Sequence, residues 1–159
     1  AGVEDEAVRA ALLWQDTKNL VRSVSINDNT VIVNTNGGKG NAVVAIYNKA
    51  GEILWSFHIW CTDQPEICEF AKNSVGNSYS VMDRNLGATT SALGVQSSYG
   101  LYYQWGRKDP FVGALGATSS ENGKMYDING GEVSFQQERA VAGLTVENAI
   151  RNPQVYYTG

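Results

Sequence analysis

Alternation of apolar and polar residues predicts that the first half of the chain is built mainly of strands. The clearest pattern covers residues 52–60, where apolar and more polar positions alternate with a period of two. The residues of the apolar face are Ile53, Trp55, Phe57 and Ile59. Together with the apolar run 42–47 and the turn Asn48-Lys-Ala-Gly51, this strand predicts a β-hairpin.

A second hairpin is predicted just upstream. Residues 23–27 and 30–34 are rich in β-branched side chains and flank Asp28-Asn29, a dipeptide typical of tight turns. The glycine loop 35–41 that follows leads into a strand. Because a phosphate-binding glycine loop leads into a helix, we interpret this one as a connection.

The remaining segments predict short elements and few helices. The spacing of apolar residues predicts helices at 99–108, where Asp109-Pro110 ends the helix, and at 145–151, where Thr145 caps it. Residues 4–16 have helical spacing or form a mobile lead-in. We also expect a polar loop at 61–78. Short strands are expected at 79–83 and, as a sheet edge, at 132–135.

These elements predict an α+β fold with a strand-dominated antiparallel sheet and two or three short helices. We expect an N-terminal lead-in at residues 1–22 and a single β-rich domain at 23–159, because no shift in composition forces a further division.

Composition and charge narrow the possible functions. Only 18% of the residues are charged, whereas the chain has 17 glycines and 14 asparagines. The net charge of −4 repels phosphate backbones, so we expect no nucleic-acid partner. No apolar run reaches 18 residues, so we expect no transmembrane segment.

The two cysteines are candidates for a disulfide. Cys61 and Cys68 bracket six residues, and a bond between them would close a small loop. The alternative is two free thiols. Their spacing does not match a zinc site, and we expect no metal. A disulfide is typical of exported proteins.

Polar residues offer two readings at each position. His58 is a candidate general base without a local partner, or a histidine bonded at a sheet surface. The acidic stretch Asp63, Glu66 and Glu69 is a loose calcium site or a solvated loop. Asp83 and Arg84 form a functional pair at a cleft, or Asp83, Arg84 and Asn85 form a clasp that pins a loop. We favour the structural reading of each.

The segment 99–111 contains five aromatic residues beside polar ones. Its candidate ligand-binding residues are Tyr102, Tyr103, Trp105, Arg107 and Asp109. Aromatic faces next to planar polar groups suit sugar rings, although aromatic side chains more often pack in a core. The chain shows no pattern of a catalytic triad or of paired carboxylates. We therefore expect no catalytic residues, no enzyme activity and no cofactor.

Two motifs carry a resemblance to a known family. They are Asp83-Arg-Asn-Leu-Gly-Ala-Thr89 and Tyr99-Gly-Leu-Tyr-Tyr-Gln-Trp-Gly-Arg-Lys-Asp-Pro-Phe111, and segments 40–47, 53–63 and 145–153 agree with them. Over about residues 13–157 the chain resembles exported Bacteroidetes surface proteins of the fimbrillin or fimbrial-adhesin type, which carry the major paralogous domain first described from Fibrobacter.

The resemblance implies an exported protein, either a lipoprotein of the cell surface or outer membrane or a secreted protein, with a domain related to C-type lectins and to sulfatase-modifying factors. Its implied role is adhesion, through binding of glycans or proteins. The alternatives are a pilus or surface-assembly subunit that recognises only its neighbours and, more remotely, an enzyme of the sulfatase-modifying-factor type.

One departure from the family concerns the end of the chain. Family members usually continue into a Cys-Pro-x-Gly-Trp-Arg-x-Pro segment, whereas this sequence ends at Gly159. We therefore expect a domain that lacks its C-terminal segment, with a sheet edge open to strand addition by a neighbouring subunit.

Overall fold

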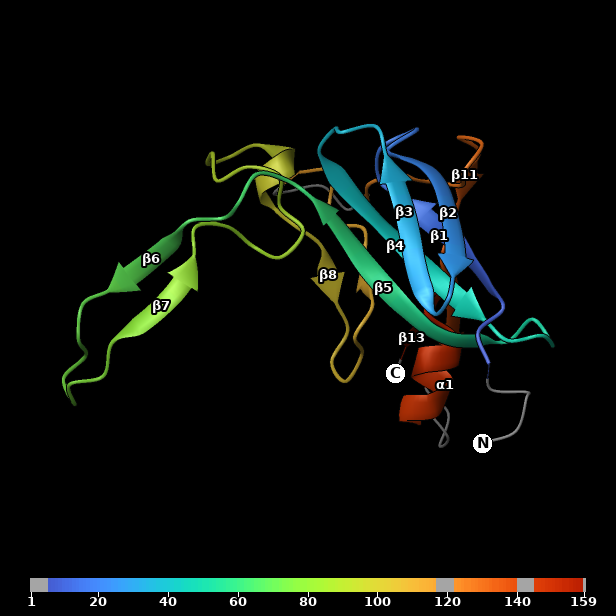
Figure 1. The fold of residues 1–159 in the computed structure, drawn as a ribbon. Coiled ribbons are helices and arrows are strands. Elements are labelled where there is room, and N and C mark those ends of the chain that lie inside the picture. Colours follow the sequence, from blue (N-terminus) through green and yellow to red (C-terminus); the bar gives the residue numbers. More distant parts are fainter. Residues whose placement is uncertain (1–5, 117–121, 140–144, 159) are drawn as a thin grey trace.

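The centre of the molecule is a five-stranded sheet. The computed structural model describes residues 6–116, 122–139 and 145–158. The order of the strands across the sheet is β11-β10-β1-β4-β5, and neighbouring strands are antiparallel (Figure 1). Their bounds are β1 Arg9–Gln15, β4 Gly40–Tyr47, β5 Ile53–Cys61, β10 Met125–Tyr126 and β11 Glu132–Val133. The predicted hairpin of β4 and β5 and the edge strand near 132–135 are confirmed.

The N-terminal segment is part of this sheet. β1 pairs with β4 on one side and with β10 on the other, so it lies near the middle of the sheet. The lead-in expected at residues 1–22 therefore contains a central strand, and the helical reading of 4–16 is wrong. Pairing with β4 decides the conformation of these residues, because tertiary contacts override weak local propensity.

Strand β5 has its faces the other way round from what its alternation suggested. Ser56 pairs with Ala45 and His58 with Val43, so these two polar residues share the core face of the sheet. Ser56 is only 3% exposed, whereas Trp55 and Phe57 on the opposite face are each 39% exposed. An irregularity in the register near residue 54 places Ile53 on the core side as well.

The hairpin of β2 (Val21–Asn27) and β3 (Thr30–Thr35) is confirmed. Asp28 and Asn29 have positive φ angles of 44° and 62°, as two-residue hairpin turns require. Val24 and Ile26 lie opposite Val33 and Val31, which gives the hairpin one apolar face. The hairpin follows β1 directly and is drawn beside the sheet in Figure 1.

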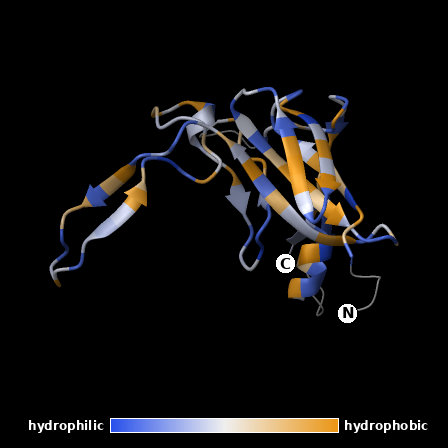
Figure 2. Cartoon of the chain, viewed as in Figure 1, coloured by the Kyte–Doolittle hydropathy of each residue, from blue (hydrophilic) through white to orange (hydrophobic). Residues whose placement is uncertain are grey.

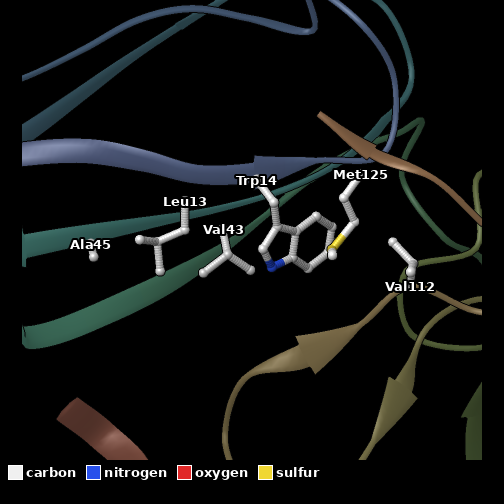
Figure 3. Packing of buried hydrophobic residues seen from close by; sticks show 6 residues of the cluster. All are labelled: Leu13, Trp14, Val43, Ala45, Val112 and Met125. Carbon is white, nitrogen blue, oxygen red and sulfur yellow. The ribbon is translucent and has the colours of Figure 1, made fainter. Parts of the chain in front are cut away.

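The hydrophobic core lies on the face of the sheet that carries Ser56 and His58. Its buried members are Leu13, Trp14, Val43, Ala45, Val112 and Met125 (Figure 3). Trp14 is fully buried, and its ring meets Phe135 edge-on at 6.2 Å between centroids. The core thus joins β1 and β4 to the segments around 111 and 125–135, which are far away in sequence.

Short elements complete the structure. They are β6 (Ile67–Phe70), β7 (Tyr79–Met82), the 3-10 helix η2 (Gln96–Ser98), β8 (Tyr102–Tyr103), β9 (Pro110–Phe111), β12 (Gln136–Arg139), α1 (Val146–Arg151) and β13 (Val155–Thr158). β6–β7 and β8–β9 are antiparallel hairpins, whereas β12 and β13 are parallel. The predicted strand at 79–83 is confirmed, and β6 lies within the segment expected to be a polar loop.

The helices differ from expectation. α1 is confirmed with its cap, since Asn148 N donates to Thr145 Oγ1 at 3.1 Å. The helix predicted at 99–108 is wrong, because these residues form β8 and a turn held by distant partners. The structure is 44% strand and 6% helix. Among the described residues, α1 is the only α-helix, and no helix is long and apolar enough to span a membrane.

Candidate functional site

The site is built on the turn 104–107, which lies between strands β8 and β9. Arg107 N donates to Gln104 O at 3.0 Å, and Gly106 has a φ of 77°. A positive φ at the third residue is the mark of a type II turn, and glycine adopts it without strain. Trp105 occupies the second position of this turn.

Both ends of the turn are attached to the C-terminal strand β13. The side chain of Gln104 donates to Tyr157 O at 2.5 Å and accepts from Tyr157 N at 3.3 Å. Arg107 donates through Nη1 to Val155 O at 2.5 Å and through Nη2 to Asn152 O at 2.8 Å. Four hydrogen bonds therefore hold the turn in one place.

Arg107 is buried between aromatic rings. Its guanidinium lies 5.4 Å from the centroid of Phe111 and 5.3 Å from that of Tyr157. Burial lowers the pKa of Arg107. Its Nε is buried without a hydrogen-bond partner. All these contacts are internal, so Arg107 holds the fold together rather than facing a ligand.

Lys108 and Asp109 attach the same segment to strand β5. Ser56 Oγ donates to Asp109 Oδ1 at 2.7 Å, and Lys108 Nζ lies 2.8 and 3.0 Å from the two carboxylate oxygens of Asp109. Lys108 also donates to Ser56 O at 2.9 Å and sits 4.5 Å from the centre of the Trp55 ring. Asp109 is 2% exposed. A serine beside a lysine invites comparison with a nucleophile and its base. Here the ammonium is bonded to a carboxylate and the hydroxyl is buried, so the arrangement is a cross-link.

His58 belongs to a second polar network on the same strand. Its Nε2 lies 2.9 Å from Asn41 Oδ1, and its Nδ1 lies 3.3 Å from the hydroxyl of Tyr103. Asn41 Nδ2 donates to Asp16 and to Gly87 O, so its oxygen faces His58 and accepts from Nε2. Burial lowers the pKa of His58 to about 4, against an opposing effect of Asp109. The ring is therefore neutral at pH 7 and has both nitrogens bonded.

The aromatic side chains of this segment reach the surface. Trp105 is 98% exposed, although Gln104 and Arg107, the first and last residues of its turn, are held by hydrogen bonds. Tyr102 and Tyr103 on β8 are also exposed, and the hydroxyl of Tyr103 is bonded to His58. The three aromatic candidates thus lie at the surface, and the two charged candidates, Arg107 and Asp109, form the support beneath them.

Residues 83–85 form a separate cluster at the start of a long loop. Arg84 donates to both oxygens of Asp83 at 2.8 and 2.9 Å and to both oxygens of Asp63 at 3.2 and 3.3 Å. Lys39 also bonds to Asp63. Lys39 and then Arg84 hold the pKa of Asp63 well below its usual range. Asn85 donates to Tyr99 O at 3.3 Å.

The two cysteines are both free, so the structure does not contain the disulfide expected between them. Cys61 is the last residue of β5, whereas Cys68 lies in β6 on a hairpin that extends away from the sheet (Figure 1). A bond would require the hairpin to fold back. Burial raises the pKa of the Cys61 thiol, and the negative charge of Asp16 adds to this effect.

Neither the acidic stretch nor the pocket beside β4 offers a ligand site. Asp63, Glu66 and Glu69 do not converge, and the described residues contain no group of three or more His, Cys, Asp or Glu side chains able to hold a metal ion. A pocket of about 360 Å³ has charged residues in its lining, namely Asp16, Lys39 and Lys124. Lys39 is paired with Asp63 and Lys124 with Glu132, and Asp16 accepts hydrogen bonds from Asn41, so all three charged groups already have partners within the chain.

Sequence reasoning found the aromatic segment but missed the residues that hold it. Gln104, Lys108, Ser56 and Asn41 were not singled out. One signal was present, because Gln104 and the four consecutive polar or glycine positions 106–109 interrupt a segment that is otherwise rich in aromatic residues. Their partners lie about 50 residues away and become neighbours only in the folded chain.

Searches with this chain against protein-family models, curated proteins and solved structures gave no match.

Proposed function

We propose that this chain is a non-enzymatic surface protein that binds carbohydrate through Trp105, with Tyr102 or Tyr103 of the preceding strand β8 as a further contact. The observation that carries the proposal is an almost fully exposed indole on a turn whose first and last side chains make three hydrogen bonds to β13 and one to Asn152, just before that strand. Because the turn is already held in place, binding has to order only the Trp105 side chain, which lowers the entropic cost.

The chemistry of the exposed groups suits a sugar. Tryptophan and tyrosine offer flat apolar faces for the C–H face of a pyranose, and the Tyr103 hydroxyl supplies a polar contact at its edge. Tryptophan and tyrosine are also the residues most often found to dominate binding energy at interfaces. A protein ligand is the alternative occupant of the same surface.

The cellular setting follows from the resemblance and the composition. We propose an exported, cell-surface adhesin or fimbria-associated component, in agreement with the motifs at 83–89 and 99–111 and with the low charge content. We also propose a relation to C-type lectins for this β-rich domain.

A glycan array tests the proposal. We expect the folded chain to bind a defined set of glycans and Trp105→Ala to lose at least about tenfold in affinity, equivalent to about 1.4 kcal/mol. Leu93→Ala is the matched control, because Leu93 is 96% exposed but lies in another loop. Its binding should equal that of the wild type.

Two results would contradict the proposal. One is the absence of any glycan signal from the folded chain. The other is equal binding by Trp105→Ala and Leu93→Ala. Far-ultraviolet circular dichroism of each variant shows that a loss of signal does not come from unfolding.

A further inference from the structure

Strands β6 and β7 form an arm, residues 67–82, that extends away from the rest of the molecule (Figure 1). Its base is fixed. Arg84 bonds to Asp63 before β6 and to Asp83 after β7, and only 4% of the Arg84 side chain is exposed. The arm is therefore a defined projection and not a loose loop, yet every residue of both strands is exposed.

One face of the arm is apolar. Cys68 lies opposite Val81, and Phe70 opposite Tyr79, so these four side chains share one face. The other face is mixed: it carries Ile67 opposite Met82 and Glu69 opposite Ser80, and Ser80 Oγ donates a hydrogen bond of 2.9 Å to Glu69. Figure 2 shows hydrophobic segments in both strands of the arm. An isolated two-stranded hairpin is marginal in water, and a further strand stabilises it.

The free backbone groups of β7 can be assigned. Asp83 N donates to Glu66 O at 2.9 Å, so residue 83 turns its backbone groups toward β6. Because these groups alternate along a strand, Val81 and Tyr79 also face β6, whereas Ser80 and Met82 direct their N–H and C=O outward. The outer edge of β7 thus presents a row of unpaired donors and acceptors.

This edge lacks the usual protection against pairing. Residues 73–82 contain no charged side chain and no proline, whereas β6 carries Glu69 and follows Pro65 and Glu66. Exposed edges are commonly blocked by charge or proline. The chain has a net charge of −4, so two copies repel each other where their acidic surfaces meet. β7 carries no charged side chain, so this repulsion is weakest along its edge.

We propose that β7 is an interface with a second copy of this chain. The two β7 strands pair antiparallel, with Ser80 of each copy opposite the other, to give a four-stranded sheet. This register matches the outward backbone groups of Ser80 and pairs Met82 with Ser78 of the second copy. It also places Tyr79 against Val81 of the second copy, so the two apolar faces become continuous.

Sedimentation of the folded chain over a range of concentrations, with reductant present, tests the proposal. We expect a reversible monomer–dimer equilibrium that reductant does not abolish, because Cys68 lies on β6, away from the new seam. The variant Ser80→Pro removes the outward N–H and should be monomeric. Glu69→Pro is the matched control, since it places proline at an outward position of β6 and loses the same Ser80–Glu69 bond; it should still dimerise.

A charge exchange keeps the test decisive if a proline disturbs the arm. Tyr79→Lys/Val81→Lys and Tyr79→Glu/Val81→Glu should each be monomeric, because like charges then meet across the seam. An equimolar mixture should form a heterodimer. These side chains are exposed, so the substitutions leave the body of the fold unchanged.

Three outcomes overturn the proposal: a wild-type chain that is monomeric at every concentration, a dimer that Ser80→Pro leaves intact, or a dimer abolished by reductant. The proposal stands apart from glycan binding. Trp105→Ala should dimerise like the wild type, and Ser80→Pro should retain glycan binding per site.

Discussion

At the scale of single residues, the buried polar side chains in the described part of the chain are nearly all hydrogen-bonded, and many of their partners come from distant segments. His58 is bonded at both ring nitrogens, and Ser56 is bonded to Asp109 and Lys108. Such groups are costly to bury alone and stabilising when every bond is made. These side chains therefore stabilise the fold through their hydrogen bonds.

His58 makes stability depend on pH. The unfolded chain binds its proton with a pKa near 6.5, and the folded chain with one of about 4. Between these values the unfolded state holds more protons, so the free energy of unfolding falls as the pH drops from 6.5 toward 4. The contribution is complete above pH 6.5 and amounts to at most about 3 kcal/mol, less what solvent screens at the partly exposed ring.

Nuclear magnetic resonance checks this prediction directly, because His58 is the only histidine of the chain. Its ring signals should not titrate above pH 5 in the folded protein. In urea unfolding, His58→Gln should lose less stability between pH 6.5 and pH 4.5 than the wild type. A ring that titrates near 6.5 in the folded state contradicts the prediction.

Removing Arg107 should destabilise the fold without touching the exposed ring beside it. Arg107→Ala leaves the carbonyls of Asn152 and Val155 without their donor, at about 1–3 kcal/mol each. We expect a loss of about 3 kcal/mol in urea unfolding. Arg151→Ala is the control, because Arg151 bonds to Glu52 and Glu147 at the surface and should cost less than about 1 kcal/mol. Equal losses of stability in the two variants would show that the hydrogen bonds of Arg107 do not stabilise the fold.

At the scale of elements, the outer edges of β5 and β7 differ in whether a charged side chain protects them against pairing with another strand. β5 is the edge strand of the central sheet, and Lys108 bonds to its backbone at Ser56 while covering Trp55. A lysine at an edge strand opposes further pairing. The outer edge of β7 has no such residue, which is why we assign the intermolecular contact to the arm.

The variant Lys108→Ala probes this difference. It leaves the buried carboxylate of Asp109 without its cation and Ser56 O without a donor, so we expect a loss of about 3 kcal/mol. Lys124→Ala removes an exposed pair with Glu132 and should cost less than about 1 kcal/mol. Chemical denaturation measures both. Light scattering should also show more association of Lys108→Ala, and its absence would argue against edge protection by Lys108.

At the scale of the whole molecule, the proposed sites are separate. The ring of Trp105 lies on a turn attached to β13, and the β7 edge lies on an arm attached through Arg84. A pair of copies joined at β7 would carry two Trp105 rings. Linked sites raise apparent affinity for a surface with repeated sugars without any new contact.

Local patterns were enough for parts of the fold with near neighbours in sequence. The hairpins β2–β3 and β4–β5 were predicted because alternation and a turn signal occur within about 20 residues. The helix expected at 99–108 was wrong because its aromatic spacing is equally compatible with a strand and a turn. In the candidate site, Tyr102, Tyr103 and Trp105 were named from composition, whereas Gln104 and Lys108 were missed because their partners are distant.

The sequence by itself determined the strand-rich character, the two hairpins and the cap of α1, because these depend on side-chain period and on turn or cap residues close by. The tertiary structure decided which face of β5 is buried, that Arg107 and Asp109 are supports, and that Trp105 is left exposed. The physical reason is that burial of a polar group depends on a partner across the fold. Ser56 and His58 could enter the core side only because Asp109, Lys108, Asn41 and Tyr103 meet them there.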